Sequence, residues 1–322
     1  MGTETDGSIV SPSSICGLVG LKPTVGRMSR DGIVPISHTQ DTPGPMARSV
    51  ADVALLYAAM VGRDAADEAT AGQPRDAAPG LLRVALPADA LQGARLGVAR
   101  AYFTGFDEVD TLIEKTLVDL KRLGAEIVDP VDLAPPTYGD AELRVLLYEL
   151  KADLPKYLAE FAPGAKVKTL ADAIAFNKAE HGREMPWFAQ ELFEKAEAYG
   201  GLDSKEYLDS LAECRKAARD DGIDRVMKAN RLDALIAPTG GPAWLIDPVN
   251  GDHSGASFSS PAAVAGYPHL TVPAGFVRGL PVGLSFVGMA WSEARLLALG
   301  HAYETLTRHR RPPTFTARTT PT

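Results

Sequence analysis

The sequence predicts an α/β fold in which a mixed central β-sheet is flanked by helices. Two short apolar segments, at residues 96–98 and 127–131, are separated by a helical pattern over 107–123 that ends at Gly124. This order predicts a parallel strand–helix–strand crossover. The chain has 322 residues and a hydrophobic content of 45%, which is enough to bury the core that such a sheet needs.

The first fifty residues are rich in Gly, Ser, Thr and Pro and show little periodicity, so we expect an ordered loop with short buried strands. Long loops of small residues usually carry a functional site. Ser49 then precedes an apolar series that runs to Met60, with Asp52 three residues further on and Gly62 as a stop signal. This pattern predicts a helix with a variant capping box.

Residues 139–231 are almost wholly helical in pattern, and we interpret them as a helical insert or cap within one domain, 1–322. After residue 231 the helical pattern ends. Short strands are predicted at 234–237, 269–273 and 279–288, followed by one long helix over 292–308. The segment 310–322 is rich in Pro and Thr and is expected to be a flexible tail.

Composition and charge exclude several classes of partner. The formal net charge is −8, from 33 Lys and Arg against 41 Asp and Glu, and no run of five or more like charges is present, so nucleic acid is not an expected partner. Apolar runs such as 53–61 are far shorter than the roughly 20 residues of a membrane span, so no membrane partner is expected. The two cysteines, Cys16 and Cys214, are far apart and give no disulfide framework.

A candidate for acyl-transfer chemistry lies at the start of the chain. Thr5, Asp6, Gly7 and Ser8 form a short polar turn before the apolar pair Ile9 and Val10. Successive amides in such a turn can face one concavity, where they would stabilise the oxyanion that forms when a hydroxyl attacks a carbonyl. Taken alone, however, such runs are ordinary turn chemistry.

The wider sequence gives this turn a context. The run GTETDGSIVSP occupies residues 2–12 and CGLVGLKPT occupies 16–24. The segments that follow in order are DTPGPMARSVAD at 41–52, 233–239, AGYP at 265–268 and GLPVG at 279–283. Together they resemble the amidase signature family, and the resemblance covers nearly the whole chain.

The resemblance implies hydrolysis of a linear amide through a serine, a second serine in a cis peptide and a lysine, with no metal and no organic cofactor. Carried over by position, Ser8 matches the nucleophile, and the amides of Thr5, Asp6, Gly7 and Ser8 match the oxyanion hole. In the family the lysine and the second serine precede the nucleophile. We therefore expect both to be missing from this chain, and its activity alone to be impaired.

Two residues depart from the commonest form of the signature, which has Gly at the position of Asp6 and Arg at that of Val10. If the turn needs positive φ at Asp6, aspartate tolerates it better than most residues. Without the arginine, a small anionic substrate is disfavoured. The loop at 30–35 is most similar to bacterial peptide amidases, so the expected partner is a small-molecule or short peptide amide, and the expected reaction removes the amide from peptide C-termini.

Other hypotheses stay open at this stage. The chain could be the glutamine-hydrolysing subunit of a tRNA amidotransferase, a hydrolase of cyclic amides or nylon oligomers, or a catalytically inactive fragment that serves as a binding module. Exposed sheet edges would favour self-association, so a homodimer is a further expectation. The cellular compartment is left open.

Several residues have a simpler interpretation than catalysis. Lys22 is expected to be structural or on the surface rather than the base. The serines after Ser8, which are Ser11, Ser13 and Ser14, are expected to bond to one another or to cap the next element. A triad of Ser8, His38 and Asp41 could be drawn, but loop packing is the better explanation for the last two. Cys16 is expected to fill the core.

The remaining candidates concern metals and aromatic side chains. His181 with Glu180 and Glu184 could suggest a metal site, but no second histidine lies at helical spacing, so a solvated helix face is expected. Aromatic residues could line an apolar substrate cleft, although packing in a core is commoner. These residues are Trp187, Phe188, Phe193, Trp244 and Trp291.

Overall fold

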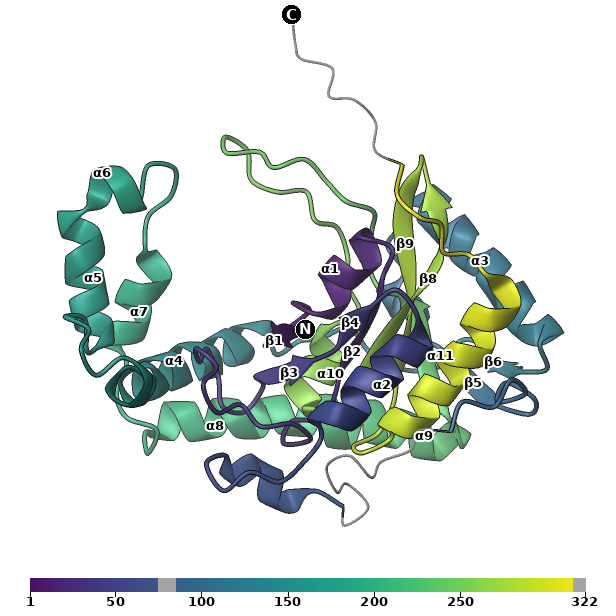
Figure 1. Ribbon diagram of the computed structural model, residues 1–322, viewed down its shortest axis with the longest axis horizontal. Coiled ribbons are helices and arrows are strands. Elements are labelled where there is room, and N and C mark those ends of the chain that lie inside the picture. The colour runs from purple at the N-terminus through teal and green to yellow at the C-terminus, as the bar shows by residue number, and fades with distance from the viewer. Residues whose placement is uncertain (75–84, 315–322) are drawn as a thin grey trace, which may run out of the picture.

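The computed structural model describes residues 1–74 and 85–314. Its centre is a seven-stranded sheet with the strand order β4-β2-β8-β9-β7-β5-β6 (Figure 1). The strands are β2 (Val19–Lys22), β4 (Met46–Ala47), β5 (Arg95–Val98), β6 (Glu126–Val128), β7 (Ala234–Pro238), β8 (His269–Val277) and β9 (Leu280–Val287). β5 pairs in parallel with β6 and β7, whereas the other pairs are antiparallel. The prediction of a mixed sheet flanked by helices is confirmed.

The strand–helix–strand crossover is also present. Helix α3 (Asp107–Arg122) connects β5 to the parallel strand β6. Strand β6 ends at Val128, three residues before the predicted end at 131, and Pro130 has no N–H to continue the ladder. At the C-terminal side, β8 runs to Val277 rather than 273, because it pairs with β9 over its whole length.

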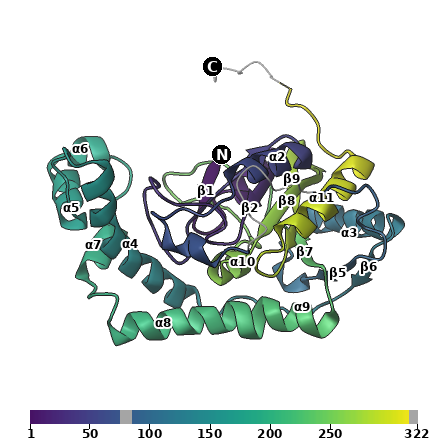
Figure 2. The same ribbon diagram turned by 60° about the horizontal axis from the view of Figure 1, so that its bottom comes forward.

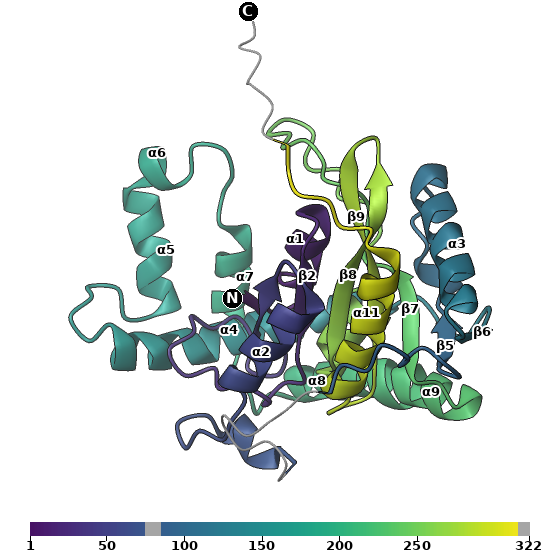
Figure 3. The same ribbon diagram turned by 45° about the vertical axis from the view of Figure 1, so that its right-hand side comes forward.

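One face of the sheet carries the larger apolar core. Helices α2 (Val50–Met60), α3 and α11 (Glu293–Thr307) cover it, and Figure 3 shows α2 and α11 side by side in front of the strands. Strand residues alternate between the two faces, so that Ala234 and Ile236 of β7 join this core while Leu235 and Ala237 join the opposite one. Of the predicted capping box at α2, the N-cap is confirmed, because the Ser49 side chain accepts a hydrogen bond from the Asp52 amide, while Asp52 Oδ2 accepts from the Ser49 hydroxyl and not from its amide.

The middle of the chain is helical, and only part of it packs against the opposite face of the sheet. The elements that do so are α4 (Gly139–Phe161), α8 (Lys205–Arg215), the π-helical segment η3 (Lys216–Ile223) and α9 (Asp224–Asn230), whereas α5 (Leu170–Ala179), α6 (His181–Glu184) and α7 (Glu191–Ala198) extend from α4. Figure 2 shows α8 to α9 as one long run beneath the molecule, with α5, α6 and α7 standing apart as an arm. The arm has a small core of its own, formed by Leu147, Leu170, Ile174 and Ala196.

The first fifty residues contain more regular structure than the sequence predicts. Strands β1 (Gly2–Glu4) and β3 (Thr42–Gly44) form a separate antiparallel pair, and residues Val10–Ile15 form helix α1. The prediction of loop and strands missed this helix, which is six residues long and contains Pro12 in its first turn. Proline is tolerated there because a first-turn N–H has no partner within the helix.

The elements that complete the fold are short. They are the 3₁₀ helices η1 (Glu68–Gly72) and η2 (Arg100–Tyr102) and the helix α10 (Ser260–Ala265). Of the expected tail at 310–322, residues 315–322 lie outside the described residues. No helix within the described part of the chain has the length and apolar character required to cross a membrane.

Helix α1 lies directly on the sheet because small residues separate them. An added Cβ at Gly20 of β2 would lie 2.2 Å from Ser13 Oγ and 2.8 Å from Ser13 Cβ. Ser13 Oγ donates to the Ile9 carbonyl at 2.7 Å, and Ser14 Oγ accepts from the Gly283 amide of β9 at 2.8 Å. Ser13 and Ser14 were expected to bond to another serine or to cap the next element, but Ser13 bonds within α1 and Ser14 bonds to the sheet.

We predict that Gly20→Ala lowers the free energy of unfolding by about 1–3 kcal/mol, because the new methyl group overpacks the contact between β2 and α1. Urea denaturation followed by circular dichroism measures the change. Gly139→Ala is the matched control, since a Cβ at Gly139 meets no atom within 4 Å. Equal midpoints for the two variants would show that α1 has room to move away from β2.

Candidate active site

The turn that carries Ser8 connects β1 to α1. Ser8 is exposed, whereas Gly7, Ile9 and Val10 are buried. The positive φ of this turn falls on Gly7, at 83°, and not on Asp6, so the tolerance expected of aspartate is not needed there. A Cβ at Gly7 would lie 3.1 Å from Ser259 Oγ. Glycine is therefore required by the backbone conformation.

A buried carboxylate holds the start of α1 beneath this turn. Glu4 Oε2 accepts hydrogen bonds from the Ile9 amide at 2.8 Å and the Val10 amide at 3.0 Å, and the Gly7 amide also faces this carboxylate. These N–H groups have no acceptor within the helix, so an anion satisfies them and opposes the positive end of the helix dipole. Burial raises the pKa of Glu4, while Lys22 and the amides oppose that shift.

Lys22 is the nearby cation. It was expected to be structural or on the surface, and the surface alternative is wrong because its side chain is fully buried. Its Nζ donates to the Pro23 carbonyl at 3.1 Å, and Glu4, Glu293 and Asp6 are the charges that act on it. Burial lowers the pKa of Lys22 to about 8, against the attraction of these carboxylates. Lys22 therefore serves as a counter-ion inside the protein.

Thr5 and Asp6 are held by other parts of the chain. Thr5 Oγ1 donates to Asp41 Oδ1 at 2.6 Å, and Ser260 Oγ donates to Asp6 Oδ2 at 2.6 Å. Within the described residues, the amides of Asp6 and Ser8 donate to no acceptor of the chain, and neither does the Ser8 hydroxyl. The structure thus brings the four residues of the predicted oxyanion hole into one turn, in which the Gly7 amide faces Glu4.

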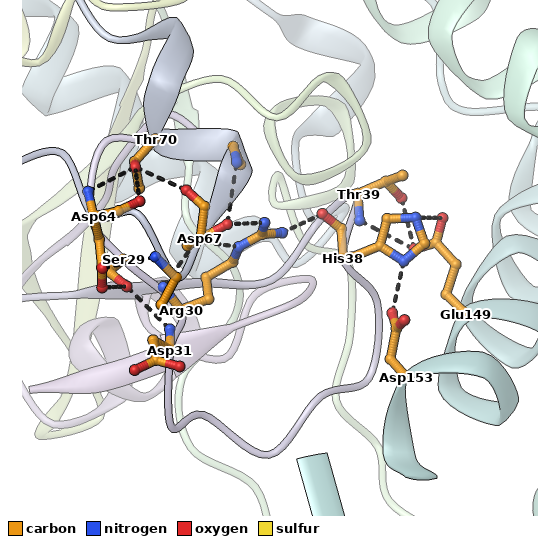
Figure 4. A network of polar contacts seen from close by, with 12 residues as sticks. Ser29, Arg30, Asp31, His38, Thr39, Asp64, Asp67, Thr70, Glu149 and Asp153 are labelled. Atoms are coloured by element: carbon orange, nitrogen blue, oxygen red, sulfur yellow. Dashed lines mark hydrogen bonds and ion pairs between the residues drawn. The ribbon is translucent and has the colours of Figure 1, made fainter. Parts of the chain in front are cut away.

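Asp41 connects the turn to the loop that precedes it. Its Oδ2 accepts from the amides of Ile36 and Ser37 at 2.8 and 2.7 Å, while its Oδ1 holds Thr5. The loop itself is fixed at Arg30, whose guanidinium forms two hydrogen bonds to Asp67, at 2.8 and 2.5 Å, and donates to the His38 carbonyl (Figure 4). Asp41 therefore fixes Thr5, and with it the Ser8 turn, relative to this loop.

Helix α4 braces the same loop from the other side. His38 Nδ1 lies 2.6 Å from Asp153 Oδ2, and its Nε2 lies 3.4 Å from Glu149 Oε1 (Figure 4). Glu149 is fully buried and its Oε2 accepts from Ser37 Oγ at 2.5 Å and from the Thr39 amide at 3.0 Å. Burial alone would lower the pKa of His38, but the hydrogen bond to Asp153 and the charge of Glu149 raise it.

These contacts do not assemble the triad of Ser8, His38 and Asp41. His38 is paired with two carboxylates of α4, and Asp41 is paired with Thr5 and two backbone amides. The explanation by loop packing therefore agrees with the structure. The prediction that Cys16 fills the core is wrong, because Cys16 is exposed at the C-terminal end of α1, while Cys214 is buried.

Of the other candidate residues, Trp244 lines a cavity of about 70 Å³ with Ser11 and Ser14 of α1, and the rest lie elsewhere. His181 and Glu184 are exposed on α6, and no cluster of three or more His, Cys, Asp or Glu that could hold a metal ion occurs among the described residues. Trp187 and Phe188 are 76% and 77% exposed, so the expectation of core packing is wrong for them. Phe188 and Phe193 line a cavity of about 440 Å³ on the arm, whereas Trp291 lines another of about 720 Å³.

Several site residues were not singled out from the sequence. Glu142, Glu149 and Asp153 lie at spacings of seven and four on α4, and hence on the helix face that also buries Val145. Acidic residues that repeat on the apolar face of a helix were the available signal. Glu4 and Gln40 gave no such signal, because their partners are distant backbone groups or side chains.

Comparison with known proteins supports a single family. The family model described as Amidase matches residues 1–297. The chain belongs to the amidase family. Among curated amidase relatives, a probable amidase of Arabidopsis thaliana is 36% identical over 98% of this chain and 58% of its own length. A glutamyl-tRNA(Gln) amidotransferase subunit from Hahella chejuensis is 32% identical over 97% of this chain and 64% of its own length.

Solved amidase structures agree with this assignment. The native peptide amidase from Stenotrophomonas maltophilia is 48% identical with a TM-score of 0.90, and covers 98% of this chain and 63% of its own. A structure of the peptide amidase PAM in complex with the competitive inhibitor chymostatin is 47% identical, with a TM-score of 0.92, and covers 97% of this chain and 63% of its own. The chain thus spans less than two thirds of the length of these relatives.

We predict that His38→Gln lowers the melting temperature more at low pH than at high pH. A histidine whose pKa is raised by folding contributes stability that is present below its ordinary pKa of 6.5 and lost as the pH rises through the folded value. The difference between wild type and variant should shrink as the pH rises above 6.5. His253→Gln, in an exposed loop, is the control. A constant difference across this range would contradict a charged His38 contact.

Proposed function

We propose that the protein hydrolyses carboxamides by acylation of Ser8. The single observation that carries this proposal is the anchored turn: Ser8 is exposed at the start of α1 while Glu4, Asp41 and Ser260 hold the residues around it. A nucleophile needs such a fixed position, and unpaired amides beside it suit a developing oxyanion. Membership of the amidase family gives the reaction its class.

In the proposed reaction, Ser8 Oγ attacks the carbonyl carbon of the amide and a tetrahedral intermediate forms. Of the four amides expected from the resemblance, those of Thr5, Asp6 and Ser8 are the proposed donors to its oxygen, because the Gly7 amide faces Glu4. The carbon–nitrogen bond then breaks, ammonia leaves with the proton taken from Ser8, and water hydrolyses the acyl-enzyme. The base that moves this proton is, by the family resemblance, a lysine that precedes the nucleophile.

The proposed substrate is the C-terminal amide of a short peptide. The support is the similarity to peptide amidases, at 47% and 48% identity with TM-scores of 0.90 and above. A glutaminase role has weaker support, since the amidotransferase subunit from Hahella chejuensis is 32% identical. The 6-aminohexanoate cyclic dimer hydrolase, at 21% identity and a TM-score of 0.70, shares the fold alone.

A second candidate is a chain that folds and binds but does not turn over. The observation in its favour is that the Ser8 hydroxyl has no hydrogen-bond partner within the described residues, so no base contacts the nucleophile there. Both the 322-residue chain and the product of the whole open reading frame that contains it must therefore be assayed.

Self-association through exposed surface remains a prediction, to be measured by size-exclusion chromatography with light scattering.

We predict that Ser8→Ala lowers ammonia release from an N-protected dipeptide amide by at least about a thousandfold, because no acyl-enzyme can form. It should also abolish labelling by a fluorophosphonate. Ser11→Ala, one turn further along α1, is the matched control and should keep both. Peptide amide and glutamine are compared at equal concentration.

Labelling that survives Ser8→Ala would refute the nucleophile. Activity of the open-reading-frame product without activity of the 322-residue chain would support an amidase whose base lies outside this chain. Faster release from glutamine than from the peptide amide would move the proposal to the glutaminase role.

A further inference from the structure

We propose that Glu142, on helix α4, is a positioning residue for the turn that carries Ser8, and that it acts by sharing a proton with Asp6. The proposal rests on the proposed function and deepens it. Asp6 stands where the commonest family signature has glycine, so its side chain requires a partner that the signature itself does not supply. Glu142 lies outside every motif by which the chain resembles its family.

Hydrogen bonds link Glu142 to the turn in two ways. Gln40 Nε2 donates to Glu142 Oε1 at 3.0 Å and to the Thr5 carbonyl at 3.3 Å, so one amide group joins α4 to the turn. The carboxyl groups of Glu142 and Asp6 also contact each other directly. The other oxygen of Asp6 accepts from Ser260 Oγ at 2.6 Å, which fixes the direction of its side chain.

The contact between the two carboxyl groups requires a proton. Two ionised carboxylates can only accept hydrogen bonds, and they repel each other when they are buried. Glu142 is 9% exposed. If both carboxyl groups are ionised, the buried Asp6 Oδ1 has no hydrogen-bond donor among the described residues. A proton on Glu142 would supply that donor. Burial, and then the charge of Asp6, raise the pKa of Glu142 to about 7.

The groups that face this pair come from several elements. Tyr138 precedes α4, and Cys214 lies on α8 with Arg144 nearby. Burial raises the pKa of Cys214 to about 12 and raises that of Tyr138, so both stay neutral near pH 7. Lys22 acts on Asp6 from β2, and its own pKa is about 8. Lys22 is present in both the wild type and the Glu142 variants. A difference in pH dependence between them therefore reports the titration of Glu142 and not that of Lys22.

The consequence is a turn whose geometry depends on one proton. Below pH 7, Glu142 donates to Asp6 and holds the Asp6 backbone, whose amide is a proposed oxyanion donor. Above pH 7, the pair becomes two adjacent anions, and their repulsion displaces the turn. Loss of that donor geometry would lower the rate of acylation more than it lowers substrate binding.

The first measurement needs no activity. A carboxyl group whose pKa is raised by folding contributes stability that is present below its ordinary value of 4.5 and lost as the pH rises through about 7. The urea midpoint of the 322-residue chain should therefore fall between pH 5 and 8, and Glu142→Gln should remove part of that fall. Asp6→Asn should reduce it as well. Glu160→Gln, exposed on the same helix, should follow the wild type.

The second measurement uses the product of the whole open reading frame and the hydrolysis of a peptide amide. Glu142→Gln, which keeps a donor for Asp6 at every pH, should remove a decline of kcat above pH 7 with little change in KM. Glu142→Ala should lower kcat/KM about tenfold at pH 6, as expected for one lost hydrogen bond to a charged group. Glu160→Gln should again match the wild type.

The possible results separate the two proposals. Wild-type pH dependence of unfolding in Glu142→Gln would overturn the shared proton. An altered unfolding profile with an unaltered pH profile of kcat would overturn the positioning role. Failure of the proposed function is detected independently, because Ser8→Ala would then leave hydrolysis intact while the unfolding profiles still report on the carboxyl pair.

Discussion

The geometry of the site depends on the contact between the Glu4 carboxylate and the amides at the start of α1. Without it, the N–H groups of Gly7, Ile9 and Val10 would have no acceptor, and a six-residue helix has little stability of its own. The contact places a negative charge in the interior, and the fully buried Lys22 compensates it. A buried ion with neither a partner nor hydrogen bonds would cost several kcal/mol. The Glu4 carboxylate therefore fixes the position of the Ser8 turn, and Lys22 balances the charge that this requires.

The central sheet provides two different faces for this arrangement. The face towards α2, α3 and α11 is apolar, with Leu270, Val272, Leu284 and Phe286 among its residues. The part of the opposite face beneath α1 has small residues instead, which are Thr271, Ser285 and Gly283. Small side chains let α1 approach closely, and hydroxyl groups satisfy one another there. The hydrophobic face stabilises the sheet, and the small residues on the other face allow α1, the helix that follows the Ser8 turn, to lie on it.

The fold was largely predictable because its strands and long helices follow regular apolar periods. The helices at 50–60, 107–122 and 293–307 were predicted almost to the residue, since each buries one stripe against the sheet. Helix α1 was missed because its six residues are fixed by Glu4 and by the sheet rather than by their own pattern. The Ser8 turn could be predicted from a motif. Its supports could not, because Asp41, Gln40 and Glu142 meet it only after distant segments of the chain have come together.

The supports of the turn also determine which kind of change the site can tolerate. Thr5 is held through Asp41 by the loop at 29–41, and that loop is held by Arg30 with Asp67 on one side and by Glu149 with Asp153 on the other. Two independent braces mean that the loss of one contact leaves the other in place, so single losses should shift the turn rather than unfold it. Asp6 has only Ser260 and the Glu142 carboxyl group as side-chain partners among the described residues. The position of Asp6 is therefore the part of the turn most sensitive to a single proton, and the amide of this same residue is a proposed oxyanion donor.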